Sequence, residues 1–331
     1  MCAAMEFGRS VKLARMKWLL ALVAGLAVVV VGVLLTAPRP EAGPPEVEES
    51  PVDVEAVAAQ LRAEVLPAPF DALARHATPK TPPRDGEWLD AHPEEGQSFA
   101  GFCREVTPAK GRAVYLVPVG AFTEPHAAMF DSLEPLVRAW LLLEVRRLPA
   151  IAGKDASVGQ RKGVAGNTQW HTETILELLR ARRPDDAAAT MGITSVDLYP
   201  DPAWNFVYSQ ASYDECVGIS SLARDGEGGA DEVLFRRRAF TTTVHEVGHM
   251  LGLAHCVAWE CAMNGSNHRV EADSRPLEPC PACLAKLQRA VGFDLRARWD
   301  EVERAYQAAG LRDGVEAVRA ARQLAFPDAG P

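Results

Sequence analysis

The chain has 331 residues, of which 48% are hydrophobic, so it is long enough to build one sizeable core or two small ones. Its formal net charge is -9 at pH 7. Because proteins that bind nucleic acid normally present a basic face to the phosphate backbone, this acidic balance argues against a nucleic-acid partner.

The first predicted element is an apolar segment from Trp18 to Ala37, which contains no charged side chain and is long enough to span a bilayer as one helix. Basic residues dominate residues 1–17, while the Pro/Glu-rich tether 38–53 is acidic. The positive-inside rule then predicts a single-pass membrane protein with a short cytoplasmic segment and the rest of the chain outside the cytoplasm. The alternative is a cleaved signal sequence, which would give a secreted or periplasmic protein. It is less favoured because Leu35-Thr36-Ala37 is a poor cleavage site.

The N-terminal segment 54–111 follows the tether. Val54 to Val65 has helical periodicity, but Pro67 to Pro93 is dense in proline, histidine and charge and has no clear period. We predict no function for this segment from its residues.

The pattern changes after residue 111. We predict a strand in AVYLVPV from Ala113, a helix over Phe130–Leu148, and a second helix over Asn167–Arg182 with Asn167 or Thr168 as its N-cap. Strands are predicted in Thr190–Tyr199, Asn205–Ala211 and Cys216–Ser221. This order of strands and helices predicts an α+β fold.

A further helix is predicted to end at Gly252, and its last part reads HEVGHMLGLAH. His245 and His249 lie four residues apart and therefore share one helix face, and a turn at Gly252 can return His255 as a third ligand. Three imidazoles with an open fourth position are typical of a catalytic zinc site. Glu246 is then placed to take a proton from a zinc-bound water. The alternative, an amphipathic helix with solvent-facing histidines, is disfavoured because the full HExxHxxGxxH pattern rarely arises by chance.

The chain has seven cysteines, four of which cluster near the histidines. That clustering favours a metal site over a distributed set of disulfides, although an oxidising compartment would permit two disulfides instead. We interpret the isolated Cys103 and Cys216 as lone thiols, with only weak grounds for Cys103 as a cap on the zinc. The four clustered cysteines are Cys256, Cys261, Cys280 and Cys283.

The spacing of these residues resembles one family. HExxHxxGxxH followed at once by cysteine, then CVAWECAM, then CPAC, is similar to the archaemetzincins, a branch of the metzincin zinc metallopeptidases. The resemblance extends roughly from Ala113 to Asp294. It leaves out the anchor, the tether and the last thirty or so residues.

The resemblance implies an α+β metzincin-like zincin domain over residues 112–300, with a mixed sheet, an active-site helix and C-terminal helices, followed by a C-terminal helical tail over 301–331. It implies two zinc ions per chain, one catalytic and one structural. It also implies that the strand Asp214–Arg224 is the sheet edge on which a peptide substrate would extend, although the residues leave an ordinary sheet strand equally open. The residues carried over are His245, His249 and His255 as catalytic zinc ligands, Glu246 as general base, Met263 as the Met-turn methionine beneath the zinc, and Cys256, Cys261, Cys280 and Cys283 as structural zinc ligands.

The leading hypothesis is therefore a membrane-anchored zinc metallopeptidase with its catalytic domain outside the cytoplasm and a peptide or protein as substrate. The residues leave aminopeptidase and endopeptidase action both open. The alternative is a zinc-containing peptide-binding or scaffold module with little catalytic activity, which the complete set of ligands and base disfavours. His171 and His268 are interpreted as surface or structural histidines, with His268 close enough to Met263 in sequence for a supporting role.

Overall fold

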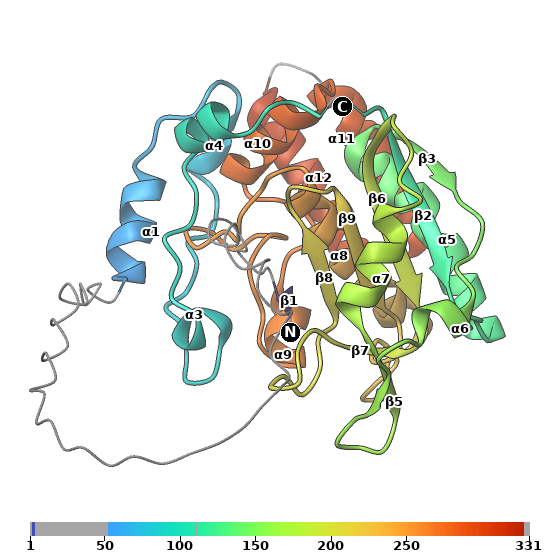
Figure 1. Ribbon diagram of the computed structural model, residues 1–331. Coiled ribbons are helices and arrows are strands. Elements are labelled where there is room, and N and C mark those ends of the chain that lie inside the picture. The colour runs from blue at the N-terminus through green and yellow to red at the C-terminus, as the bar shows by residue number, and fades with distance from the viewer. Residues whose placement is uncertain (1, 4–51, 110, 328–331) are drawn as a thin grey trace, which may run out of the picture. The chain divides into compact units, whose positions relative to one another are not determined.

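The computed structural model describes residues 2, 3, 52–109 and 111–327 (Figure 1). The predicted anchor Trp18–Ala37, most of the segment before it and most of the tether lie outside these residues. Among the helices in the described part of the chain, none is both long and apolar enough to cross a bilayer.

Within the described residues, the largest sheet has six strands in the order β1-β8-β9-β6-β2-β3 (Figure 1). Neighbouring strands run parallel, except that β8 and β9 are antiparallel, so the sheet is mixed as predicted. The strands are β1 Cys2–Ala3, β2 Ala113–Val119, β3 Glu144–Arg147, β6 Ala187–Thr194, β8 Ser209–Ser212 and β9 Val217–Ser221.

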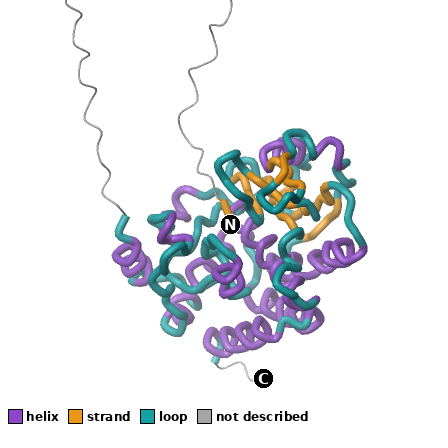
Figure 2. The backbone as a smooth tube through the Cα atoms, turned by 90° about the horizontal axis from the view of Figure 1, so that it is seen from below, coloured by secondary structure: helices purple, strands orange, loops and turns teal. Residues whose placement is uncertain are grey.

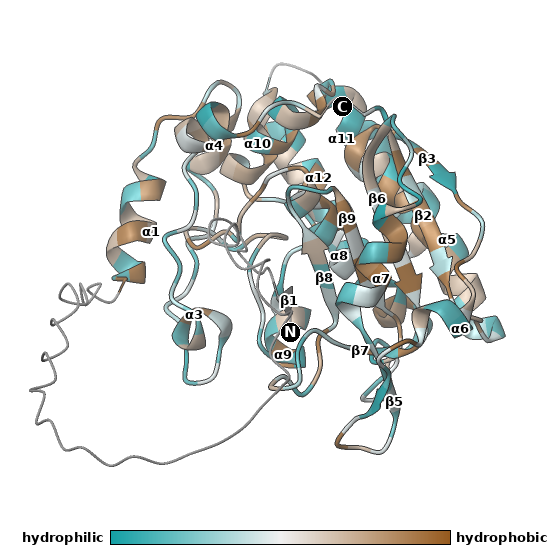
Figure 3. Cartoon of the chain, in the orientation of Figure 1, coloured by the Kyte–Doolittle hydropathy of each residue, from teal (hydrophilic) through white to brown (hydrophobic). Residues whose placement is uncertain are grey.

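The interior strand β2 is apolar on both faces, which explains its place between β6 and β3. Val114 and Leu116 pack into one hydrophobic core, whereas Val117 and Val119 pack into a second core. Because alternate residues of a strand point to opposite faces, a continuous apolar run is what a strand covered on both sides requires. The edge strand β3 differs, since three of its four residues are exposed, and it is largely hydrophilic in Figure 3.

Helices cover both faces of the sheet, and Figure 2 shows them around the strands. Helices α5 and α8 pack on one face, with α11 against α5 and α12 against α11, while α7 covers the opposite face. C-terminal helices are therefore present, as the resemblance implied. The helices from residue 112 onward are α5 Glu124–Leu141, α6 Gly153–Ala156, α7 Thr172–Arg180, α8 Glu232–Met250, α9 Arg269–Ser274, α10 Pro281–Val291, α11 Leu295–Ala309 and α12 Arg312–Ala325.

The N-terminal segment packs onto the same core as the rest of the chain. Phe70 and Phe102 are fully buried there, and the helices that carry them contact α10. The first helix begins where predicted, because the side chain of Asp53 caps it by accepting a hydrogen bond from the backbone of Ala56. The helices are α1 Val54–Arg62, α2 Phe70–Ala74, α3 Trp88–Ala91 and α4 Phe99–Glu105.

Two predicted helices have different bounds in the structure. The helix expected over Phe130–Leu148 starts earlier, as α5, and ends at Leu141 because Leu142 adopts a left-handed conformation with φ 51°. The residues after it form β3. The helix expected over Asn167–Arg182 begins only at Thr172, since the residues before it pair with another strand. That small sheet has the order β4-β5-β7, with β4 Arg161–Lys162, β5 Thr168–His171 and β7 Asp197–Tyr199.

The predicted strands also need correction. The run Thr190–Tyr199 is divided between β6 and β7, which belong to different sheets, and only the end of Asn205–Ala211 is extended, as part of β8. The expectation that Asp214–Arg224 provides the sheet edge is wrong. Its strand β9 lies between β8 and β6, because the chain turns back at residues 213–216 and places β8 outside it.

Helix α8 matches its prediction at the C-terminal end. It begins after Asp231, whose side chain accepts a hydrogen bond from the backbone of Leu234, and it ends at Met250. Gly252 follows with φ 91°, and a Cβ there would lie 2.6 Å from Val106. Both the backbone conformation and the contact therefore require glycine at this turn.

Candidate metal centres

The three predicted histidines come together in the interior. His245 and His249 project from adjacent turns of α8, and His255 returns from the loop after Gly252. One ring nitrogen of each lies within 4.8 Å of the other two, and all three side chains are buried. The structure therefore brings these three residues together.

Backbone carbonyls orient the two helical rings. His245 Nδ1 lies 2.9 Å from the carbonyl oxygen of Ala262, and His249 Nδ1 lies 2.7 Å from that of Leu253. A carbonyl oxygen can only accept, so each Nδ1 carries the proton and each Nε2 keeps its lone pair. Both Nε2 atoms are therefore in the form that binds a metal.

The facing nitrogens fit a cation. His245 Nε2 and His249 Nε2 lie 3.0 Å apart, and His255 Nε2 is buried without a hydrogen-bond partner among the described residues. Lone pairs directed at one another repel unless a positive charge lies between them. Burial lowers the pKa of both helical histidines well below the ordinary value, so the rings stay neutral. A donor set of three imidazoles suits zinc.

Two polar side chains approach the outer sides of these rings. Arg275 Nη1 lies 3.1 Å from His245 Nδ1, and the Tyr213 hydroxyl lies 2.8 Å from His249 Nδ1. The contact of His245 with Ala262 is shorter, and Arg275 also donates to the carbonyl of Asn264, so the carbonyl decides which nitrogen of His245 is protonated. The charge of Arg275 adds to burial in keeping His245 neutral.

Glu246 lies beside this cluster and is fully buried. The hydroxyl of Ser209, at the start of β8, donates to Glu246 Oε1 over 2.6 Å. This hydrogen bond fixes the carboxylate against the sheet. A carboxylate held next to three metal-binding imidazoles is placed to move protons.

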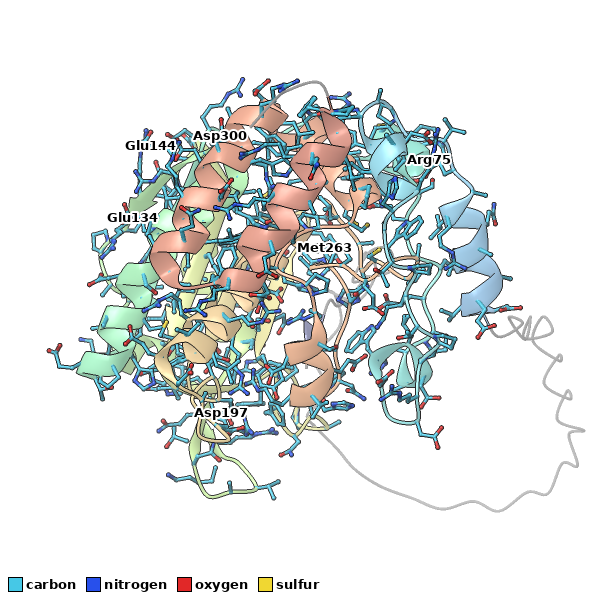
Figure 4. All side chains as sticks on the ribbon, turned by 180° about the vertical axis from the view of Figure 1, so that it is seen from behind. Arg75, Glu134, Glu144, Asp197, Met263 and Asp300 are labelled. Atoms are coloured by element: carbon cyan, nitrogen blue, oxygen red, sulfur yellow. The ribbon has the colours of Figure 1, made fainter. Side chains whose placement is uncertain are left out.

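Met263 lies in the interior under α8, and Figure 4 labels it beside the C-terminal helices. A Cβ added to Gly248 would lie 2.5 Å from Met263 Sδ, so the thioether packs directly on the helix between the two histidines. The carbonyl of Met263 also accepts a hydrogen bond from the backbone of Cys256. Met263 thus joins α8 to the loop that carries His255.

The second cluster contains the four predicted cysteines. All four are buried, and their sulfur atoms lie within 4.8 Å of one another. Cys256 Sγ and Cys280 Sγ are 3.7 Å apart, far beyond the length of about 2.05 Å of a disulfide. Each of the four is a free thiol, so the structure favours the metal interpretation over two disulfides.

Backbone groups around the sulfurs suit thiolates. Cys261 Sγ accepts from the backbone N–H of Cys280 at 3.1 Å and of Met263 at 3.4 Å. Burial raises the pKa of Cys261 and Cys280 well above the ordinary value, whereas hydrogen bonds from the neighbouring thiols lower that of Cys256. A bound cation is therefore needed to ionise the whole set. Four sulfurs in a closed arrangement suit a structural zinc ion.

Comparison with known proteins identifies the family. The sequence model of Peptidase family M54 matches residues 164–289 of this chain. Archaemetzincin-2 of Rattus norvegicus is 34% identical over 251 residues, which cover 64% of this chain and 70% of that protein. Archaemetzincin-2 of Homo sapiens is 33% identical over 256 residues, covering 66% and 71%. The chain belongs to the archaemetzincin family.

This archaemetzincin is therefore a zinc-dependent metallopeptidase, and the family resemblance drawn from the sequence is confirmed. The archaemetzincin of Methanopyrus kandleri, a solved structure, has a TM-score of 0.46 and 27% identity over 57% of this chain and 99% of its own.

His171, His268, Cys103 and Cys216 belong to neither cluster. His171 Nε2 lies 3.1 Å from the carbonyl oxygen of Pro200, and His268 accepts the backbone N–H of Glu271 at the start of α9, so both are structural. Cys216 Sγ donates to the carbonyl of Met250 over 3.5 Å, and Cys103 packs half-buried against the core. Within the described residues, neither thiol belongs to a group that could hold a metal ion.

Sequence reasoning missed the residues around the histidines in this archaemetzincin. Ser209, Tyr213 and Arg275 are far from the histidines in sequence, and Glu94, whose carboxylate contacts His255, lies in the N-terminal segment 54–111, for which no function was predicted. Burial acts to raise the pKa of Glu94, but the electrostatic attraction and hydrogen bond of His255, together with the hydrogen bond from Trp88, outweigh it and hold that pKa below the ordinary value. No local pattern marks any of these four residues.

Proposed function

We propose that His245, His249 and His255 bind the catalytic zinc ion of this peptidase, and that Glu246 is its general base. The convergence of three buried ring nitrogens within 4.8 Å carries this proposal. Cys256, Cys261, Cys280 and Cys283 would bind a second, structural zinc ion, so that each chain holds two.

A zinc ion held by the histidines would act as a Lewis acid, lowering the pKa of a water and polarising the scissile carbonyl group. Glu246 accepts a proton from the attacking water and passes it to the leaving nitrogen. The hydrogen bond from Ser209 keeps the carboxylate in place for both transfers. Met263, packed on Gly248, keeps α8 in register with the loop of His255.

A peptide substrate is proposed to extend along the outer side of β8, beside Glu246. That side pairs with Cys2–Ala3, which supports strand addition there. Aminopeptidase and endopeptidase action are both compatible with such binding. They differ in whether the peptide continues beyond the zinc in both directions.

Membrane attachment through Trp18–Ala37 is part of the proposal and rests on sequence alone, namely the apolar length and the change from basic to acidic flanks. The peptidase domain would then lie outside the cytoplasm. Cys2–Ala3, which precede the span, would have to leave β8 in the anchored protein. Fractionation of cells that express the whole chain tests this. Recovery of the intact protein in the membrane fraction supports an anchor, whereas a soluble, shortened chain indicates cleavage.

A peptide-library digest read by mass spectrometry tests the activity. Wild-type protein is compared with Glu246→Gln and with the control Glu232→Gln, which lies on the same helix with a side chain that is 79% exposed. Cleavage by the wild type and the control, lost in Glu246→Gln, supports the proposal and reveals any preference for chain ends. If zinc binds but none of the three proteins cleaves any peptide, a peptide-binding or scaffold role replaces the proposed catalytic role.

A further inference from the structure

The third histidine, His255, has a different hydrogen-bond partner from the other two. His245 and His249 are part of a rigid helix and donate to backbone carbonyls, but His255 lies on a loop beyond the end of α8. Its Nδ1 lies 2.9 Å and 3.1 Å from the two carboxylate oxygens of Glu94. A carboxylate can only accept here, so His255 donates through Nδ1 and directs the lone pair of Nε2 toward the other rings.

Glu94 is itself held in place. Trp88 Nε1 donates to Glu94 Oε1 over 2.8 Å, and the Trp88 ring contacts His255 edge-on, with 5.1 Å between ring centroids. The backbone N–H of Trp88 is bound in turn by the carboxylate of Glu271, at 3.0 Å and 3.1 Å. Trp88 is only 4% exposed, so this arrangement has little freedom to shift.

The residues after Glu94 attach to the same loop. Gln97 donates to the carbonyl of Gly252 over 3.1 Å and accepts from the backbone of Ala254 over 3.3 Å. Gly96 packs so closely on Val257 that a Cβ would lie 2.7 Å from it. The stretch from residue 94 to 97 therefore contacts the His255 loop on both sides of the ligand.

We propose that Glu94 is a positioning residue of the catalytic zinc site, which makes the N-terminal segment 54–111 part of the catalytic unit. The inference rests on the proposed function of the three histidines. A carboxylate behind a metal-binding imidazole fixes its tautomer and orientation and increases its basicity, and loss of such a partner typically weakens metal binding by about 10 to 100-fold. Because the acceptors for the Nδ1 protons of His245 and His249 are uncharged carbonyls, Glu94 is the anionic acceptor of the set.

The test is metal affinity, measured on the full chain with Co²⁺ after the protein has been stripped with a chelator. Absorption separates the two centres, since only the cysteine site gives thiolate-to-metal charge transfer. Glu94→Gln keeps the size and an accepting oxygen but removes the charge, whereas Glu94→Ala removes both. Glu95→Gln is the matched control, because Glu95 is the exposed neighbour.

We expect Co²⁺ to bind the histidine site about 10-fold more weakly in Glu94→Gln and up to about 100-fold more weakly in Glu94→Ala. Affinity at the cysteine site should be unchanged in both, and Glu95→Gln should match the wild type at both sites. Equal affinity at the histidine site in the wild type and Glu94→Gln, or an equal loss at both sites, would overturn the role of Glu94. Absence of metal from the wild-type histidines would instead contradict the proposed function. If Glu94→Ala fails to fold, Glu94→Gln still decides.

Discussion

The contact between Gly248 and Met263 predicts a measurable clash. In Gly248→Ala, the new methyl group would lie 2.5 Å from Met263 Sδ and 2.9 Å from Cε. Non-bonded heavy atoms prefer about 3.5–4.0 Å, so the methyl is about 1 Å too close. Met263 is fully buried and has no route to solvent.

Two opposing effects determine how much Gly248→Ala changes the free energy of unfolding. Alanine is about 1 kcal/mol more favourable than glycine inside a helix, whereas overpacking a core costs about 1–3 kcal/mol. We therefore expect Gly248→Ala to lower the free energy of unfolding by up to about 2 kcal/mol. Gly226→Ala is the control, because nothing lies within 4 Å of a Cβ there. It should change stability by less than about 0.5 kcal/mol.

A double-mutant cycle attributes the loss to this contact. Met263→Ala alone should cost about 2–5 kcal/mol, since it removes a buried side chain, but it also makes room for the methyl group. The double variant should therefore be about 1–3 kcal/mol more stable than the sum of the single losses predicts, as measured by urea unfolding. Additive losses would refute packing of Met263 against Gly248.

Three further predictions concern other sites. Cys280→Ser should lower the zinc content, measured by elemental analysis, from the two ions per chain that we propose. It should also weaken binding at the histidines, if the cysteine site holds the loop after His255; unchanged occupancy of the histidine site contradicts this coupling. Burial raises the pKa of Asp225 from 3.8 to about 7, so the folded state retains a proton that the unfolded state releases. The free energy of unfolding should then fall by up to about 4 kcal/mol between pH 4 and pH 7. Asp225→Asn should reduce that fall, and the same pH dependence of stability in the wild type and the variant would show the reasoning to be wrong. Arg298 is fully buried and donates to Glu278 over 2.7 Å. Arg298→Met should therefore lower the free energy of unfolding in urea by about 3–5 kcal/mol, and a decrease below about 1 kcal/mol would mean that the pair is dispensable.

The parts of the site that follow from the sequence are those set by local spacing. His245 and His249 are one helical turn apart, and Gly252 requires a positive φ, so their arrangement is encoded within a few residues. The cysteine cluster is predictable for a similar reason, because two closely spaced pairs carry a recognisable metal-binding pattern.

The parts of the site and the fold that do not follow from the sequence depend on contacts between residues that are distant along the chain. Glu94 reaches His255 across 161 positions, and Ser209 reaches Glu246 across 37. Strand order is non-local as well. The apolar run at Val217–Ser221 reads as a strand, but nothing in it indicates that β8 lies outside it. The helix predicted from Asn167 begins only at Thr172, because Gln169 pairs with Asp197 in a small sheet, which overrides helical propensity at its start.

Hydrolysis by Glu246 beside a three-histidine zinc site is tested most directly by the rate at which zinc-loaded protein cleaves one defined peptide chosen from the digest. The value of kcat/KM is compared between the wild type and Glu246→Gln, with zinc content measured in both. We predict equal zinc content and a loss of about 100 to 10,000-fold in the variant, the usual contribution of a general base. Equal rates in the two proteins would contradict the account.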